Sequence, residues 1–261
     1  MISAIQVQTI DDCNANCIVC PRKWIYKTKH QMPESQFEEI LKKIREAQGA
    51  GLVKSKVRFI LQYRNEPLCD TGIIEKINMV KRLVNCHLEF YTNGILLPAY
   101  KDKLVTSDID KITISNYGDT LEQWRKVAGI KISQERFQAM KKAGWDLAKK
   151  KNVREWEAWR EGELFDFSTR AGLTRAKKPV EKVVGCEWER PYNWLHIGIT
   201  GNLLLCCQDW KDETTYGNIF EDSLVEILKS ERYQHMMQQG TGKRPSDKNF
   251  ICKRCKFNKE K

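Results

Sequence analysis

Three cysteines lie within eight residues near the start of the chain: Cys13, Cys17 and Cys20. The preceding segment, IQVQTI (5–10), alternates and is rich in β-branched residues, so it predicts a strand that delivers the cysteines at its C-terminal end. A tetranuclear iron–sulfur cluster takes one thiolate per iron, and a C-x3-C-x2-C segment supplies only three. An open metal position can bind a small molecule directly, as a catalytic zinc does. The spacing therefore favours catalysis over a structural role.

The cysteine content also bears on the compartment. The chain has ten cysteines in 261 residues. The N-terminus lacks the basic and long apolar regions of a secretory signal, and no apolar run is long enough for a membrane span. We therefore expect a cytoplasmic protein without membrane contact, whose reduced thiols are available as metal ligands.

Strand and helix patterns alternate after the first cysteines. Helices are predicted over 34–47, 73–83, 96–104 and 133–150, and strands over 57–63, 87–92 and 111–115. This order favours right-handed βαβ units and a parallel sheet, open or curled toward a barrel, with ligands at the C-terminal strand ends. Residues 152–168 mix both signals where a fifth and a sixth strand are expected.

The pattern changes from about Val183. Two short apolar strands, 194–199 and 202–207, flank a Thr-Gly-Asn turn and predict a hairpin. A helix over 223–237 and a basic tail with two cysteines follow. We interpret this region as a separate module.

The segment DDCNANCIVCPR (11–22) resembles the radical S-adenosylmethionine (SAM) superfamily, whose CxxxCxxC signature follows the first strand of a partial (β/α)6 barrel. The resemblance implies an α/β fold of that kind, with a 4Fe-4S cluster whose open iron chelates the amino and carboxylate groups of SAM. An electron from the cluster then cleaves SAM to methionine and a 5'-deoxyadenosyl radical, which abstracts hydrogen from a substrate. Val19 departs from the family, since an aromatic residue that contacts adenine often precedes the third cysteine.

Further motifs extend the resemblance to the ends of successive strands. RNEPL (64–68) is similar to the family's GGEPL, whose acidic residue binds the SAM amino group, and TNG (92–94) ends the third predicted strand as in many members. The implied SAM-binding residues are Asn65, Glu66, Thr92, Asn93, Ser115 and Arg125. Taken singly, Glu66 is equally well a surface acid, the TNG segment a plain turn and Ser115 a strand-end cap. Their joint occurrence at strand ends is what a barrel binding one ligand at its mouth requires.

A second cysteine group resembles the SPASM-type, or twitch, auxiliary-cluster domain of the same superfamily. The implied ligands of a second 4Fe-4S cluster are Cys186, Cys206, Cys252 and Cys255. Cys207 is an alternative to Cys206, because neighbours on a strand face opposite sides; Cys206 is favoured because it follows Gly201 by five residues, as in the family pattern. From spacing alone, a structural zinc site is the alternative.

The resemblance implies a core barrel over 1–175 and an auxiliary-cluster domain over 176–261. An auxiliary cluster can accept an electron from a substrate radical, which favours a dehydrogenase-like oxidation or a peptide modification. The implied partners are a small-molecule or peptide substrate and a reductant such as flavodoxin or ferredoxin. Oxidation also needs a proton acceptor, for which Asp209 is a candidate.

Charge leaves two other hypotheses open. The net charge is +11, and the tail from Lys229 to Lys261 has ten basic and three acidic residues. A solvated basic surface is the plainer interpretation, and a nucleic-acid partner is an alternative that charge alone does not favour. An RNA-modifying radical SAM enzyme and a non-catalytic zinc or iron–sulfur protein therefore remain alternatives.

Overall fold

The computed structural model describes residues 1–25, 28–157, 159–160, 163–164, 169–174 and 178–259. Its main strands are β1 (Ile2–Val7), β2 (Val53–Ile60), β3 (Cys86–Thr92), β4 (Lys111–Asn116), β5 (Val153–Glu157), β8 (Trp194–Ile197), β9 (Asn202–Leu204) and β10 (Thr215–Asn218). They form one sheet in the order β10-β9-β8-β1-β2-β3-β4-β5, in which the stretch from β8 to β5 is parallel and β9 and β10 are antiparallel.

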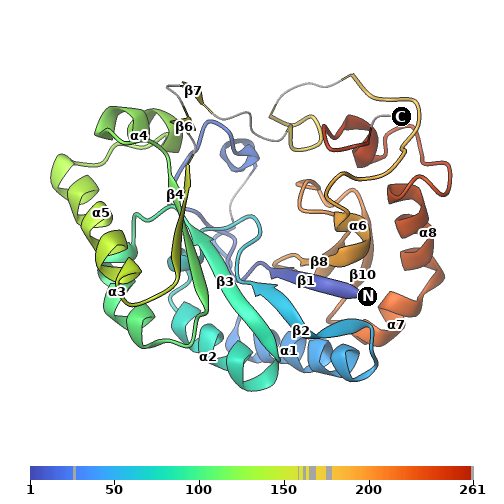
Figure 1. Cartoon of the computed structure of the whole chain (residues 1–261). Coiled ribbons are helices and arrows are strands. Elements are labelled where there is room, and N and C mark those ends of the chain that lie inside the picture. The colour runs from blue at the N-terminus through green and yellow to red at the C-terminus, as the bar shows by residue number, and fades with distance from the viewer. Residues whose placement is uncertain (26–27, 158, 161–162, 165–168, 175–177, 260–261) are drawn as a thin grey trace.

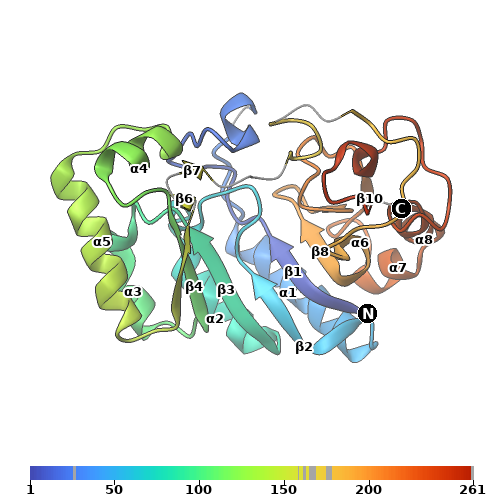
Figure 2. The ribbon, with the colours of Figure 1, turned by 45° about the horizontal axis from the view of Figure 1, so that its top comes forward.

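Helices cover the outer side of this curved sheet (Figures 1 and 2). They are α1 (Glu34–Gly49), α2 (Ile73–Leu83), α3 (Leu97–Thr106), α4 (Leu121–Ala128), α5 (Gln134–Ala148), α6 (Arg190–Asn193), α7 (Leu224–Lys229) and α8 (Glu231–Gly240). Short 3-10 turns occupy Pro21–Trp24, Pro67–Cys69 and Ile251–Arg254, and a separate hairpin pairs β6 (Trp159–Arg160) with β7 (Glu163–Leu164). Within the described ranges, no helix combines the length and apolar character needed to cross a membrane.

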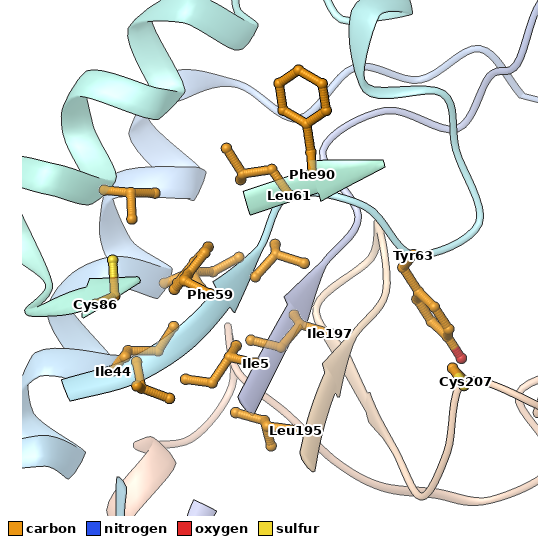
Figure 3. Close-up of a cluster of buried hydrophobic side chains, with 14 of the residues drawn as sticks. Ile5, Ile44, Phe59, Leu61, Tyr63, Cys86, Phe90, Leu195, Ile197 and Cys207 are labelled. Carbon is orange, nitrogen blue, oxygen red and sulfur yellow. The ribbon is translucent and has the colours of Figure 1, made fainter. Parts of the chain in front are cut away.

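The core lies between the sheet and its helices. Ile5, Ile44, Phe59 and Leu88 are fully buried, and Figure 3 shows several of these side chains stacked between the strands and α1. The side-chain periodicity of each strand or helix places these residues on the face that points into the core. Burial of their apolar surface therefore stabilises this packing of the helices on the sheet.

The expected α/β fold is confirmed, and α2 has the predicted bounds. β1 begins and ends three residues earlier than its predicted segment. The helix expected over 223–237 is two helices, because Ser230 adopts an extended backbone that ends α7, and its hydroxyl accepts a hydrogen bond from Tyr233 N at the start of α8. The helix α4 was not predicted, although Thr120 and Gln123 form a capping box at its start.

The sixth parallel strand comes from an unexpected part of the sequence. Within the described part of 152–168, β5 is the single strand that pairs with the main sheet. The sixth parallel strand is β8, and it pairs with β1: Ala4 is opposite Trp194 and Val7 is opposite Ile197. The predicted hairpin of β8 and β9 is confirmed. Because β8 belongs to the region predicted as a second domain, one hydrogen-bonded sheet joins both regions, and the boundary at 175/176 stays a prediction.

The cysteine loop is held by the C-terminus of α4. Asn16 N donates to Ala128 O at 2.9 Å, and Ile18 N donates to Val127 O at 3.0 Å. Gly129 ends α4 with a φ of +66°, and a Cβ there would be 2.1 Å from Asn16 O. Only glycine allows both this backbone conformation and this close approach.

Gly129→Ala is therefore expected to lower the free energy of unfolding by about 1–3 kcal/mol and to loosen the cysteine loop. Urea denaturation measures the first effect, and faster amide exchange at Asn16 and Ile18 measures the second. Gly49→Ala at the end of α1 is the control, because its new methyl group meets no atom within 4 Å. Equal stability of the two variants would contradict the proposed close approach.

Candidate active site

A cavity of about 570 Å³ lies at the C-terminal ends of the parallel strands. One side is formed by the thiols of Cys13, Cys17 and Cys20 together with Val19. The ends of β2, β3 and β4 contribute Asn65, Glu66, Thr92, Asn93 and Ser115. The cavity therefore brings together the three N-terminal cysteines and five of the six residues predicted to bind SAM.

Glu66 joins the ends of two strands to the cysteine loop. Its carboxylate accepts hydrogen bonds from Thr92 Oγ1 at 2.6 Å, Asn93 N at 2.8 Å and Leu68 N at 3.2 Å, and its own N–H donates to Asp12 O at 3.0 Å. Burial raises the pKa of this carboxyl to about 7, and these hydrogen bonds oppose the rise. Glu66 is thus a buried, oriented carboxylate rather than a surface acid.

Asn93 contacts the cysteine loop directly. Its side-chain amide donates to Asn14 Oδ1 at 2.8 Å and lies 3.9 Å from Cys13 Sγ, while its Oδ1 accepts from Ile95 N at 3.0 Å. Gly94 follows with a φ of +83°, which lets the chain turn sharply after β3. The TNG turn therefore positions a donor beside a thiol.

The end of β4 reaches a second thiol through a residue that sequence reasoning missed. Tyr117 is hydrogen-bonded to Cys17 and to Ser115, and burial raises its pKa. Burial also raises the pKa of Cys13 and raises that of Cys17 to about 12. Because burial disfavours the charged form of a thiol, a bound cation is what would let these cysteines become thiolates.

Arg125 is the one predicted SAM-binding residue that does not reach the cavity. It lies in α4, and its guanidinium donates to Ile132 O, where it ties the end of that helix to the next turn. Asn65 does reach the cavity. Its Oδ1 accepts from Tyr63 N at 3.0 Å, while its buried Nδ2 has no acceptor among the described residues.

The second cysteine group lies around the β8–β9 hairpin and the C-terminal tail. Cys186 is bridged to Asn258 in the tail, while Cys252 lies in the turn Ile251–Arg254 and Cys255 directly follows it. Burial raises the pKa of Cys252, and the charges of Cys255 and Cys186 raise it further. The tail thus returns its cysteines to the start of the same region.

The adjacent cysteines Cys206 and Cys207 lie in two different environments. Cys207 lines the cavity, where the Arg190 guanidinium donates to its sulfur, whereas Cys206 does not line the cavity. Both are buried, and Arg190 also lies in the field of Cys186. The structure thus places the two side chains in different surroundings, and the preference for Cys206 as the ligand stays a prediction.

Asp209 caps a turn instead of facing the cavity. Its carboxylate accepts from Lys211 N, Glu213 N and Thr214 N at 3.3, 3.0 and 2.7 Å, and from Thr214 Oγ1 at 2.5 Å. It is 1% exposed and is not among the residues that line the cavity. The structure therefore gives Asp209 a role in ordering the loop after Cys206, and its role as a proton acceptor stays a prediction.

Tyr63 and Arg64 connect the two cysteine regions, and neither was predicted as a site residue. The Tyr63 hydroxyl lies 3.2 Å from Cys206 O and 3.1 Å from Asp209 O, and Figure 3 shows it beside Cys207. Arg64 donates to Asp209 O and forms an ion pair with Asp212. Arg64 occupies the position of the first glycine of GGEPL. This departure from the family motif was the sequence feature that could have identified Arg64 as a site residue. The strand that presents Glu66 is thereby fixed to the loop that follows Cys206.

Fold and site together define an α/β protein with one cysteine group on a cavity at the strand ends and a second around the C-terminal hairpin and tail. Residues 7–147 match the radical SAM superfamily, and residues 186–256 match SPASM, described as an iron–sulfur cluster-binding domain. The chain belongs to the radical SAM superfamily and has an auxiliary iron–sulfur domain.

Individual relatives show the same likeness over different lengths. The SAM-dependent 2-deoxy-scyllo-inosamine dehydrogenase of Niallia circulans is 21% identical over 98% of this chain and 93% of its own. The GTP 3',8-cyclase of Alkaliphilus oremlandii is 28% identical over 48% of this chain, and the matched part spans 38% of that cyclase. The solved structure of BtrN with AdoMet and 2-DOIA has a TM-score of 0.70 at 19% identity, covering 98% of this chain and 93% of BtrN.

Membership of this family implies a SAM-binding 4Fe-4S cluster, an auxiliary iron–sulfur cluster and SAM, and the residues present fit these groups. Three thiols on one wall are the donor set of a cluster with an open iron. The side-chain Nδ2 of Asn65, which lines the same cavity, has no hydrogen-bond acceptor among the described residues and can donate to a ligand oxygen. In the part of the chain that the structure describes, no three His, Cys, Asp or Glu side chains are arranged so that they could hold a single metal ion.

The buried carboxyl of Glu66 gives the cluster-free protein a specific pH dependence. A pKa of about 7 in the folded chain, above the ordinary 4.5, favours folding while the group is protonated, and this stabilisation is lost as pH rises through 7. Between about pH 5 and about pH 8 the loss is about 3 kcal/mol. Urea denaturation of Glu66→Gln should show a profile without this loss. Glu46→Gln, which removes an exposed acid of α1, is the control and should retain the wild-type profile.

Asp209→Asn separates the two roles considered for that residue. Asparagine keeps one acceptor oxygen, so a turn-capping role predicts a loss of about 1–3 kcal/mol in the free energy of unfolding and less iron in the second site. Urea denaturation and iron analysis measure both, with exposed Asp222→Asn as the control. A variant that is stable and fully iron-loaded but forms no oxidised product would instead support the proton-acceptor hypothesis.

Proposed function

We propose that this protein reductively cleaves SAM and removes hydrogen from a substrate bound in the 570 Å³ cavity, in an oxidation assisted by an auxiliary 4Fe-4S cluster. The observation that carries the proposal is the shared cavity: Cys13, Cys17, Cys20 and Glu66 line it together with Cys207 of the C-terminal region. When bound, the reduced N-terminal cluster supplies the electron that splits SAM into methionine and a 5'-deoxyadenosyl radical, which abstracts the hydrogen.

Each side chain of the proposed SAM site has a definite task. Cys13, Cys17 and Cys20 would hold three irons and leave the fourth for SAM. Glu66 would accept a hydrogen bond from the SAM amino group, because its carboxylate is already aimed by Thr92 and Asn93. The unsatisfied amide of Asn65 would donate to the SAM carboxylate.

Ser115 would complete this site from the end of β4. It lines the cavity and is tied through Tyr117 to Cys17, so the hydroxyl is positioned beside the cysteine loop. A fixed donor beside the ribose or carboxylate orients SAM before its bond breaks, which is how a preorganised site lowers a barrier. Arg125 has no part in this proposal, because its guanidinium is engaged at Ile132 O.

The second cysteine group would hold the auxiliary cluster through Cys186, Cys206, Cys252 and Cys255. The full-length likeness to a dehydrogenase supports an oxidation, in which this cluster would accept the electron of the substrate radical and a base, for which Asp209 is the predicted candidate, would take the proton. We propose a small-molecule or peptide substrate, an electron donor such as flavodoxin or ferredoxin, and a cytoplasmic location, where thiols stay reduced. Nothing in the cavity favours an RNA substrate over a smaller one.

Anaerobic reconstitution tests the proposal. The loaded chain should contain about eight iron and about eight sulfide per molecule, as two tetranuclear clusters require, and should form 5'-deoxyadenosine from SAM and dithionite. Cys17→Ala should lose about half the iron and all 5'-deoxyadenosine. Cys69→Ala, a cysteine outside both groups, is the matched control and should retain both. Stoichiometric zinc, or an iron-loaded chain that leaves SAM intact, would contradict the proposal.

A further inference from the structure

Arg190 borders both the cavity and the second cysteine group. It is the first residue of α6, and the turn before it is closed by a hydrogen bond from Glu189 N to Cys186 O at 3.1 Å. Arg190 lines the cavity, and its guanidinium donates to Cys207 Sγ. The same cation therefore adjoins the proposed substrate space and a thiol of the second region.

Aromatic rings hold this guanidinium in place. It lies 4.2 Å from the ring centre of Trp188 and 5.0 Å from that of Trp194. Trp188 is stacked in turn on Phe257 in the C-terminal tail, with 3.6 Å between the ring centres. Contact with aromatic rings stabilises a cation that has lost part of its water, and it leaves the N–H edge for hydrogen bonds. The positive charge of Arg190 is thus fixed beside the Cys207 sulfur.

The sulfur atoms of the second region are the groups with which this charge interacts. Burial disfavours the cation, but the charges of Cys207, Cys206 and Cys186 hold the pKa of Arg190 above its ordinary value. Arg190 forms no ion pair with a carboxylate of the described residues. Its charge can therefore stabilise a negative group that the second cysteines bind.

Two other charged groups act on these cysteines. The charge of Asp209 reaches Cys252, but the carboxylate already accepts four hydrogen bonds from the loop that it orders. The charge of Arg170 reaches Cys207, where that of Arg190 is the stronger of the two. Arg190 is thus the main positive charge beside this cysteine pair.

The first cysteine group has a charge of the opposite sign beside it. Burial and then the charge of Glu66 raise the pKa of Cys13. An iron–sulfur cluster gains one negative charge when it is reduced, so a nearby anion opposes reduction and a nearby cation favours it. In the protein without SAM, the nearest charges therefore favour an electron at the second group over one at the first.

We propose that Arg190 is a positioning residue that raises the reduction potential of the auxiliary cluster and thereby lets it oxidise the substrate radical. The inference rests on the proposed function, because it assigns this cation to the electron acceptor of that reaction. The substrate radical loses one electron, the oxidised cluster gains it, and the proton goes to a base, for which Asp209 is the predicted candidate. The proposal holds with either Cys206 or Cys207 as the ligand, since the charge of Arg190 reaches both sulfurs.

Redox titration followed by electron paramagnetic resonance tests this role. The Cys17→Ala background removes the N-terminal cluster, so that the signal of the auxiliary cluster is observed alone. In that background, Arg190→Gln should move the ratio of oxidised to reduced cluster about tenfold toward the oxidised form at a fixed potential. This change is a shift of about 59 mV for a one-electron couple. Arg190→Lys keeps the positive charge and should retain most of the original potential.

Lys229→Gln is the matched control. It removes one positive charge from the exposed end of α7 in the same region, where water and salt screen that charge, so the ratio should not change.

Gln208→Glu provides the test if Arg190→Gln does not hold the auxiliary cluster. The new carboxylate would replace an amide whose Nε2 lies 3.6 Å from Cys207 Sγ. It should offset the charge of Arg190 and move the ratio about tenfold in the same direction. Iron and sulfide content checks that each variant is loaded.

An unchanged potential in Arg190→Gln, an equal shift in Lys229→Gln, or no shift in Gln208→Glu would overturn the inference. The titration involves no SAM cleavage, so the two proposals fail separately. An Arg190-dependent potential in a protein that leaves SAM intact contradicts the radical chemistry alone. Formation of 5'-deoxyadenosine by a protein whose auxiliary potential does not depend on Arg190 contradicts the role of Arg190 alone.

Discussion

The hydrogen bonds of Glu66 hold the rest of the site in place. One residue at the end of β2 bonds through its backbone to Asp12 in the cysteine loop and through its carboxylate to Thr92 and Asn93 at the end of β3. Parallel strands alone bring their ends to the same edge of a sheet, but they do not fix the loops that follow. Because a buried carboxylate is costly without partners, these three segments are stable only in their present relation. Glu66 is therefore both the proposed SAM-binding group and the residue that ties these three segments together.

Most of the strands and helices, and the group of residues at the strand ends that line the cavity, were predictable because local patterns encode them. Helix α2 and the N-terminal cysteines depend on spacing within a few residues, which the sequence displays directly. The position of β8 beside β1 was not predictable, since the choice of an edge depends on contacts between segments nearly two hundred residues apart. The contacts of Arg125 and Asp209 were not predictable for a similar reason, because a charged side chain near a motif is equally suited to tie a backbone turn, and both do so in this fold.

Departures from the family motif proved as informative as agreement with it. Where the resemblance offers two glycines before the acid, this chain has Arg64 and Asn65. Glycine at such places allows a backbone to approach a ligand closely, whereas here the two side chains supply donors of their own. Asn65 lines the cavity, where its Nδ2 has no acceptor among the described residues, and Arg64 donates to Asp209 O in the loop after Cys206. The substitution thus converts a permissive segment into one that couples the two cysteine regions.

The pairing of β8 with β1 also determines how the chain tolerates being divided. A fragment that ended before β8 would leave β1 with a free row of backbone donors and acceptors in the middle of an apolar layer. Open strand edges of that kind recruit other chains, so such a fragment would tend to aggregate even with its cysteine loop intact. The region with the second cysteine group therefore covers the open strand edge of the core sheet, in addition to its proposed binding of a cluster.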